Sequence, residues 1–182
     1  MRVVQAPEVY EKSNTEIACF LAGGCGNTEW SKRCINKLNE YTLNHLVLYN
    51  PYNPNITDPK EQIEWEFNYL NKYINDKFIF SIYFDKYTDQ PISMYELGRA
   101  SVLCKEQVIK VGPPNDPMNN LSTWCHLNWG FPMVVSLNEQ APKKRDIRIQ
   151  LDLVNIPYCV RTPEEHAEAI VFRYGIIRRQ MC

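Results

Sequence analysis

The residue with the most reactive setting is Glu96, in the stretch 91–100 with the sequence PISMYELGRA. Ser93 stands three residues before it, a spacing typical of a capping box, in which the glutamate bonds back to the start of its own helix. The same place, where a strand ends and a helix begins, is where open α/β sheets hold their ligands. The helix dipole predicts a lowered pKa and an ionised carboxylate at Glu96. Such a group either caps the helix or attacks an electron-poor glycosyl carbon, and this stretch alone favours the cap.

A glycine loop precedes the first expected helix. Gly23, Gly24 and Gly26 allow close approach of the backbone to a ligand and can present N–H groups to an anion or a hydroxyl. Glu29 occupies the place of the last glycine of a G-x-G-x-x-G motif, and no Lys-Ser/Thr pair follows to make a P-loop. The loop is therefore equally consistent with a sugar or anion site and with a plain tight turn.

A polar face is predicted on the helix that contains EQIEWE, residues 61–66. Gln62, Glu66 and Tyr69 are spaced i, i+4 and i+7, so they lie near one another on a helix. From this stretch alone, we interpret them as a solvated face beside a half-buried Trp65.

Apolar runs alternate with helical patterns along the chain. Strands are predicted at 15–24, 45–51, 76–84, 107–112, 131–137 and 154–160, and helices at 28–40, from Asp58-Pro59, from Ser93 and from 162 to 179. Residues 146–153 fit either a strand or a short helix. In the helix after Pro59, the inward face is expected to carry Ile63, Phe67, Leu70 and Ile74.

This alternation predicts an α/β fold, Rossmann-like or flavodoxin-like, with a parallel sheet of about five strands and helices on both faces. A turn-rich, aromatic stretch predicts an inserted loop around 113–130, which either closes over an aromatic ring or packs as an insertion or subunit contact. We expect a single domain over residues 1–182, with its ligands at the carboxyl ends of the strands.

Composition excludes several classes of protein. The net charge of −1, without a basic stripe, argues against a nucleic-acid polymer as partner, and no apolar run reaches the length of a membrane span. Seven cysteines without a C-x-x-C pair predict free buried thiols and a cytoplasmic location. The three histidines are scattered, so no metal site is expected, nor any cofactor. A small molecule or another protein remains as the partner.

Six motifs together resemble nucleoside 2-deoxyribosyltransferase-like proteins. They are FLAGG at 20–24, YNP at 49–51, QIEWE at 62–66, ND at 75–76, PISMYELGRA at 91–100 and RDIRIQ at 145–150. Each motif is weak alone, but their order matches the family over most of residues 16–172. The resemblance implies a small-molecule nucleoside or nucleotide substrate.

The resemblance also implies roles for individual residues. Glu96 would be the nucleophile, with its carboxylate turned toward the glycine loop rather than to the Ser93 N–H. Asp76 would be an acid associated with the base or with proton transfer to it, and Asp89 a second acid before the nucleophile. The substrate-binding residues would be Phe20, Ala22, Gly23, Gly24, Tyr49, Asn50, Trp65, Ser93, Asp146 and Gln150. A homodimer or higher homo-oligomer with shared active sites is implied, in which Asp146 or Gln150 serves a neighbouring subunit.

One position departs from the better-known transferases of this family, which carry a tyrosine in the first strand to orient the nucleophile. Here the nearest equivalent is Phe20, so we expect Tyr95 or Tyr49 to hold Glu96. The resemblance favours an enzyme, either a deoxyribosyltransferase or an N-glycosidase that forms a covalent deoxyribosyl-glutamate. The alternative is a catalytically silent or weak protein that sequesters a nucleotide in the same pocket. A less favoured third option is cleavage of another N-glycoside, such as an ADP-ribose-like compound.

Overall fold

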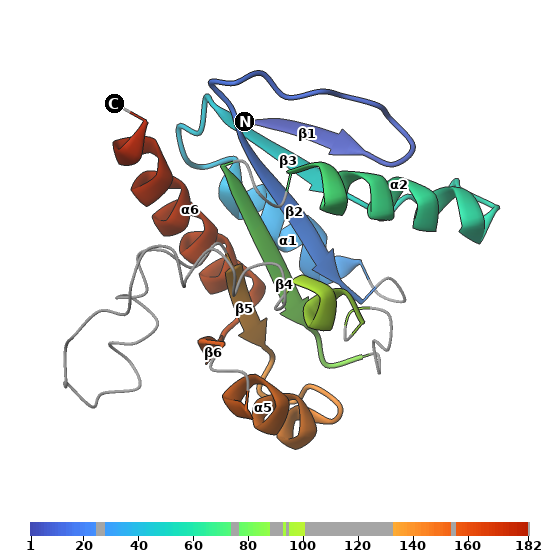
Figure 1. Cartoon of the computed structure of the whole chain (residues 1–182). Helices are drawn as coiled ribbons and strands as arrows, with labels where there is room; N and C mark the ends of the chain where they lie inside the picture. Colours follow the sequence, from blue (N-terminus) through green and yellow to red (C-terminus); the bar gives the residue numbers. More distant parts are fainter. Residues whose placement is uncertain are drawn as a thin grey trace.

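The computed structural model describes residues 1–24, 28–73, 77–87, 93, 95–100, 133–153 and 156–181. Within them, the strands are β1 (Arg2–Gln5), β2 (Ile17–Gly23), β3 (Leu46–Asn50), β4 (Phe78–Phe84), β5 (Met133–Leu137) and β6 (Tyr158–Val160). The labelled helices are α1 (Glu29–Leu38), α2 (Pro59–Tyr73), α5 (Lys144–Leu153) and α6 (Pro163–Gln180). Residues 93 and 95–100 are also helical. Figure 1 shows these helices arranged around a single sheet.

The sheet has six strands within the described residues, in the order β1-β3-β2-β4-β5-β6, and every pair is parallel. The predicted α/β fold with a parallel sheet is therefore confirmed. After β3 the chain crosses back past β2 to form β4, so the order of the strands reverses between β2 and β4. Such a reversal opens a crevice at the carboxyl ends of the strands, where ligands bind in this class of fold.

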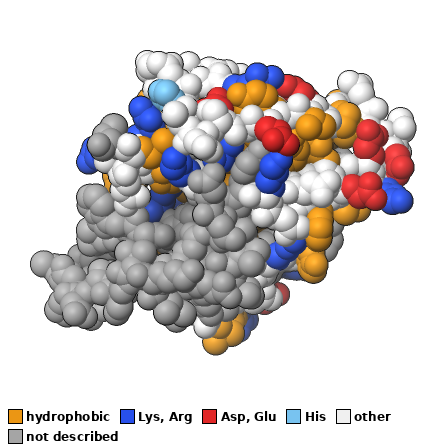
Figure 2. Space-filling model, turned by 45° about the horizontal axis from the view of Figure 1, so that its top comes forward, with side chains coloured by type: hydrophobic (Ala, Val, Ile, Leu, Met, Phe, Trp, Pro, Cys, Tyr) orange, Lys and Arg blue, Asp and Glu red, His pale blue; other side chains and the backbone are white. Residues whose placement is uncertain are grey.

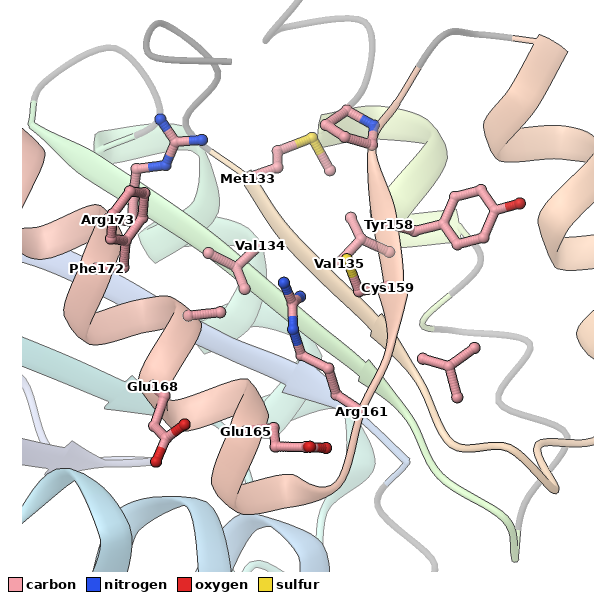
Figure 3. A pocket seen from close by; sticks show the side chains of 13 residues that line it. Met133, Val134, Val135, Tyr158, Cys159, Arg161, Glu165, Glu168, Phe172 and Arg173 are labelled. Atoms are coloured by element: carbon pink, nitrogen blue, oxygen red, sulfur yellow. The ribbon is translucent and has the colours of Figure 1, made fainter. Parts of the chain in front are cut away.

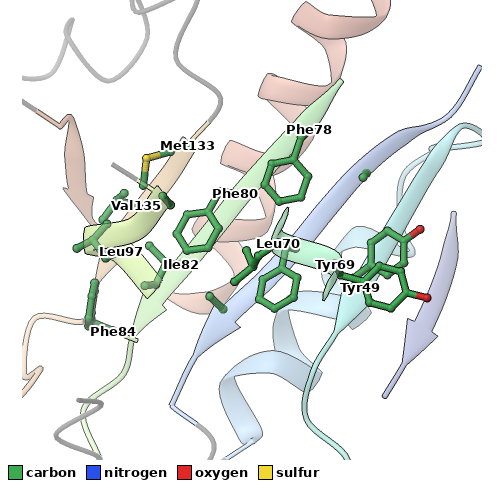
Figure 4. Packing of buried hydrophobic residues seen from close by; sticks show 14 of the residues in the cluster. Tyr49, Tyr69, Leu70, Phe78, Phe80, Ile82, Phe84, Leu97, Met133 and Val135 are labelled. Carbon is green, nitrogen blue, oxygen red and sulfur yellow. The ribbon is translucent and has the colours of Figure 1, made fainter. Parts of the chain in front are cut away.

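The central strands are buried on both faces, which explains their continuous apolar sequences. One face packs against α2, α5 and the helical residues 95–100 in a cluster that includes Phe80, Ile82 and Leu97 (Figure 4). The opposite face packs against α1 and α6 in a second cluster. Two separate cores therefore hold the sheet between two layers of helices.

The N-terminal strand was not predicted. β1 pairs with β3 along the edge of the sheet, and the segment after β1 packs on α2. The Trp65 indole N–H donates to the Glu8 carbonyl oxygen at 2.8 Å, and the Tyr10 backbone N–H donates to the Tyr69 hydroxyl at 2.8 Å. Lys72 forms an ion pair with Glu11 at 2.6 Å. The first residues of the chain therefore fix the position of α2.

The predicted inward face of α2 was wrong at Ile63 and Phe67, whereas Leu70 is buried as expected and Ile74 lies outside the described residues. Ile63 is 53% exposed and Phe67 is 51% exposed, whereas Trp65, Glu66 and Tyr69 are buried. The two aromatic side chains bury more apolar area than Ile63 and Phe67, and their polar atoms find partners in the N-terminal segment. Trp65 and Tyr69 therefore set the rotation of α2 about its own axis. As a result Glu66, which was interpreted as part of a solvated face, is buried.

Other predicted elements are confirmed in part. Residues 146–153, which fitted either a strand or a helix, are helical as part of α5, with Ile147 and Leu151 buried one turn apart. α6 begins with the expected signal, a capping box between Thr162 and Glu165. The strand predicted at 107–112 and the loop predicted around 113–130 lie outside the described residues.

The cysteines follow the expectation only in part. Cys19 and Cys34 are buried free thiols, and burial raises the pKa of both. Cys159, by contrast, is disulfide-bonded, so the prediction of free thiols was wrong there.

In the part of the chain that the structure describes, no helix is long and apolar enough to cross a membrane, and no cluster of metal-binding side chains is found. Figure 2 shows acidic and basic side chains interspersed on the coloured part of the visible face.

A buried polar chain lies under α6. The imidazole of His166 is fully buried and bonds Ser81 Oγ at 2.7 Å through Nε2 and Ser136 Oγ at 2.7 Å through Nδ1. Arg161 donates to the same Ser136 oxygen at 3.1 Å. Burial, and then the positive charge of Arg161, lower the pKa of His166 to about 3.

We expect His166 to stay neutral well below its ordinary pKa of 6.5. Between 6.5 and about 3 the unfolded chain binds a proton that the folded protein excludes, so this histidine contributes stability that is lost as the pH falls through that window. NMR titration of the imidazole carbons checks this directly. A His166 signal that titrates near 6.5 would contradict the buried neutral assignment.

Candidate active site

Glu96 lines a cavity of about 360 Å³. The helix α2 contributes Ile63, Glu66, Phe67 and Leu70 to its lining, and the helical residues 95–100 contribute Tyr95, Glu96 and Arg99. Leu97 and Ala100 are buried in the core that this helical segment shares with the sheet and α2. This packing fixes the segment beside α2. The cavity is thus built at the junction of two helices that follow β3 and β4.

A larger cavity of about 420 Å³ lies between β5, β6 and α6. Arg161 and Arg173 line it together with Glu165 and Glu168, as Figure 3 shows. Burial lowers the pKa of Arg173 to about 10. None of the predicted site residues lines this cavity, whereas the predicted nucleophile Glu96 lines the smaller one, which is therefore the candidate site.

Glu66 and Glu96 form a buried carboxyl pair. Glu66 is 7% exposed and Glu96 is 8% exposed, and their carboxyl groups are hydrogen-bonded to each other. The Gln62 amide donates to Glu66 Oε1 at 2.8 Å. Because a hydrogen bond between two carboxyl groups needs a proton, one member of the pair must be protonated.

The proton resides on Glu96. Burial raises its pKa to about 8, with further contributions from the negative charge of Glu66 and from the hydrogen bond between them. Burial raises the pKa of Glu66 as well, but the hydrogen bonds with Gln62 and Glu96 act in the opposite direction. The prediction that the helix dipole keeps Glu96 ionised was therefore wrong.

The partner of the Glu96 carboxyl group was not among those predicted. Its carboxyl group meets Glu66 on α2, a partner that neither the cap at Ser93 nor the glycine loop represents. Ser93 is buried and already has helical geometry. Neither tyrosine expected to hold Glu96 is its hydrogen-bond partner here: the Tyr49 hydroxyl donates to the Tyr10 carbonyl oxygen at 3.1 Å, and Tyr95 is 71% exposed at the cavity.

The aromatic residues of the predicted site are core residues. Phe20 is fully buried, with its ring centroid 6.4 Å from that of Trp65 and 6.4 Å from that of Phe80. Tyr49 lies 4.4 Å from the Tyr69 ring. None of Phe20, Tyr49 and Trp65 lines the cavity at Glu96. Phe20 and Tyr49 lie on strands of the sheet and pack against Trp65 of α2.

Four predicted residues lie at or near the carboxyl edge of the sheet. Gly23 ends β2 and Asn50 ends β3, while Ala22 packs in the core beneath them. Asn50 Oδ1 accepts the backbone N–H of Tyr52 at 3.4 Å. The Gly24 carbonyl oxygen accepts the Trp30 indole N–H at 3.0 Å, so the start of the glycine loop is held against α1.

Two of the remaining predicted residues are not at the cavity. Asp146 and Gln150 are exposed on α5 and do not line the cavity at Glu96. Asp76 and Asp89 lie outside the described residues.

Glu66 is the residue that sequence reasoning missed. Its spacing from Gln62 was noted, but a polar face next to one tryptophan is usually solvated. The sequence did not reveal the rotation of α2 about its axis, which directs both Trp65 and Glu66 toward the core.

Gly23 occupies a place that a larger residue cannot fill. Its φ is +156°, and an added Cβ would lie 2.3 Å from Trp30 Cζ2 and 2.8 Å from the Tyr83 carbonyl oxygen. We expect Gly23→Ala to lower the free energy of unfolding by about 1–3 kcal/mol, measured by urea denaturation. Gly175→Ala in α6, where no atom lies within 4 Å, serves as the control and should be neutral or stabilising. Equal stability of Gly23→Ala and wild type would contradict the close contact.

Glu96→Gln should flatten the pH dependence of stability. Between the ordinary pKa of 4.5 and the folded value of about 8, the folded protein holds a proton that the unfolded chain releases. The free energy of unfolding therefore falls as the pH rises, by up to roughly 1.4 kcal/mol per pH unit. The glutamine variant lacks this contribution.

Denaturation of wild type and Glu96→Gln across this range measures the difference between them. The difference isolates Glu96, because His166 acts in the opposite sense below 6.5 in both proteins. Glu64→Gln is the matched control, since Glu64 is on α2 with a side chain 63% exposed. An unchanged slope in Glu96→Gln would rule out the buried protonated carboxyl.

Comparison with known proteins identifies a family. The sequence model of a family described as nucleoside 2-deoxyribosyltransferase like matches residues 16–114. No curated protein matches the chain. The match covers more than half of the chain and includes both glutamates, while the motif at 145–150 lies beyond it. The resemblance of the sequence is confirmed, and the chain belongs to the nucleoside 2-deoxyribosyltransferase-like family.

Proposed function

We propose that this protein is a nucleoside or nucleotide 2-deoxyribosyltransferase, or the corresponding N-glycosidase, with Glu96 as its nucleophile. The observation that carries the proposal is the position of Glu96. It lies almost fully buried at an open cavity, beside a second carboxyl group, within the region that matches the family. A structural cap would have no need of a cavity or of a buried acidic partner.

The chemistry suits a carboxylate in such a place. A glycosyl carbon reacts through an oxocarbenium-like state, which a nearby carboxylate stabilises and then captures as an ester. The Glu96 oxygen attacks C1′ of the deoxyribose, the C1′–N bond breaks and its electron pair leaves with the base. A second base or a water molecule then attacks C1′ and releases the glutamate. The first acceptor makes the protein a transferase, and the second a hydrolase.

Other residues take supporting roles in this proposal. Gly23 and Gly24 approach the sugar from the carboxyl end of β2, next to Asn50 at the end of β3. By resemblance to the family, Asp76 is assigned as the acid associated with the base. Asp89 is assigned as the second acid, before the nucleophile in the chain. No cofactor or metal takes part.

We propose a homo-oligomer in which α5 reaches a neighbouring site. Asp146 and Gln150 are exposed on this helix at positions i and i+4. Ile149 is 47% exposed and Leu153 is 77% exposed at i+3 and i+7, so the four residues form one stripe with apolar and polar members. Such a stripe suits a subunit contact that places polar side chains near a partner's substrate.

We expect free base to be released when the protein is incubated with the common 2′-deoxynucleosides and their 5′-monophosphates. Chromatography follows the base, and mass spectrometry of the quenched protein detects a deoxyribosyl ester on Glu96. Glu96→Gln should abolish both signals, because the amide is a poor nucleophile. Full release by Glu96→Gln, or no release from any substrate by wild type, would refute the proposal. A second free base in the mixture separates transfer from hydrolysis.

The alternative function is capture of a nucleotide without turnover. Two features favour it: Phe20 is fully buried where transferases carry an orienting tyrosine, and burial raises the pKa of Glu96 to about 8. Tight retention of a nucleotide that stays chemically unchanged through long incubation would favour this function over catalysis.

A further inference from the structure

The pairing of Glu66 with Glu96 is costly and therefore calls for an explanation. Removing two carboxyl groups from water costs several kcal/mol, and apolar residues of similar size would often serve stability better. Among the described residues, no lysine or arginine forms an ion pair with either carboxyl group. The nearby Arg99 is engaged elsewhere: its guanidinium lies over the Phe67 ring, 4.2 Å from the centroid, and donates to Asn71 Oδ1. Pairs of this kind concentrate at functional sites.

The two glutamates are not equivalent. Gln62 donates to Glu66 at 2.8 Å and so favours the charged form of Glu66. Glu96 receives no such donor from Gln62 and carries the shared proton. The ionisable side chains lining the cavity are Glu66 from α2 and Tyr95, Glu96 and Arg99 from the other helix. Glu66 is thus the acceptor already in contact with the group that has to lose a proton before it can attack.

We propose that Glu66 is the proton partner of Glu96 in the reaction: it takes the proton from the nucleophile and passes it to the departing base. This inference rests on the proposed function. It adds a role for a residue that the sequence placed on a solvated face, and it explains how a nucleophile can be buried and protonated at rest yet react as a carboxylate.

The steps balance with one proton. At rest, Glu96 is a carboxylic acid and Glu66 a carboxylate. The proton crosses the hydrogen bond to Glu66 as the Glu96 oxygen forms its bond to C1′. The C1′–N bond breaks, its electron pair stays on the base nitrogen, and that nitrogen takes the proton from Glu66.

The second half reverses the first. Glu66, again a carboxylate, accepts a proton from the incoming water or base as that group bonds to C1′. The ester bond to Glu96 breaks and its electron pair returns to the glutamate. The proton on Glu66 then completes the shared hydrogen bond, and the resting pair is restored.

Glu66→Gln tests the role. The amide keeps the size of the side chain but cannot carry the proton. The probes are 2′-deoxyadenosine, 2′-deoxyguanosine, 2′-deoxycytidine, thymidine and their 5′-monophosphates, with base release followed across the pH range. We expect kcat to fall on the order of 10²-fold or more, the size typical of a lost acid–base group.

The shape of the pH profile separates a proton carrier from a structural residue. A pair that works with one proton gives a bell-shaped kcat/KM in wild type, because both the doubly protonated and the fully ionised forms are inactive. In Glu66→Gln only Glu96 of the pair still titrates, so the basic limb should disappear and the rate should rise with pH to a plateau as Glu96 loses its proton. Glu64→Gln, an exposed carboxylate on the same helix, should keep the wild-type rate and profile.

The outcomes distinguish this inference from the proposed function. A Glu66→Gln variant that retains the wild-type rate, or that loses rate with an unchanged bell, overturns the role of Glu66 alone. Base release by Glu96→Gln, or none by wild type, overturns the proposed function and this inference with it. Thermal melting of Glu66→Gln confirms that the variant is folded, and we expect it to be at least as stable as wild type above neutral pH because a buried charge is removed.

Discussion

Two carboxyl groups buried against each other govern the candidate site, because they cannot both lose their protons without strong repulsion in an apolar setting. The pair exists only if two separate elements are held rigidly enough to keep the groups in contact. Leu97 and Ala100 fix one element in the core, and Trp65 and Tyr69 fix the other. Both elements pack on the same face of the sheet, which therefore supports them together.

The helix dipole and burial have opposite effects on the pKa of Glu96, and the larger effect decides whether its carboxyl group is protonated. A helix N-terminus favours a nearby carboxylate by about 0.3–1 kcal/mol when the group is exposed. Burial of an ionised group costs several kcal/mol in real proteins. The second effect wins at Glu96 because the side chain is almost fully buried and its nearest partner is another acid. A position in the sequence predicts the dipole, whereas only the folded packing reveals the burial.

The sequence allowed the architecture to be predicted because parallel strands buried on both faces leave continuous apolar runs such as that of β4. It located Glu96 through the strand-to-helix junction and the family motifs. It could not predict the rotation of α2, since Ile63 and Phe67 have the same spacing as a buried stripe, and the aromatic residues that displaced them depend on contacts with residues far away in the chain. Glu66 was misjudged for the same reason. β1 was missed because four residues with mixed polarity give little periodicity.

The contacts of the N-terminal segment with β3 and α2 extend the folded domain beyond the region that matches the family. The family match begins at residue 16, but the edge of β3 and the polar atoms of Trp65 and Tyr69 are satisfied by residues before that point. A fragment cut at the boundary of sequence similarity would expose an open sheet edge, which invites pairing with other chains. In this protein the region that matches the family is therefore smaller than the region that packs into the sheet and its helices.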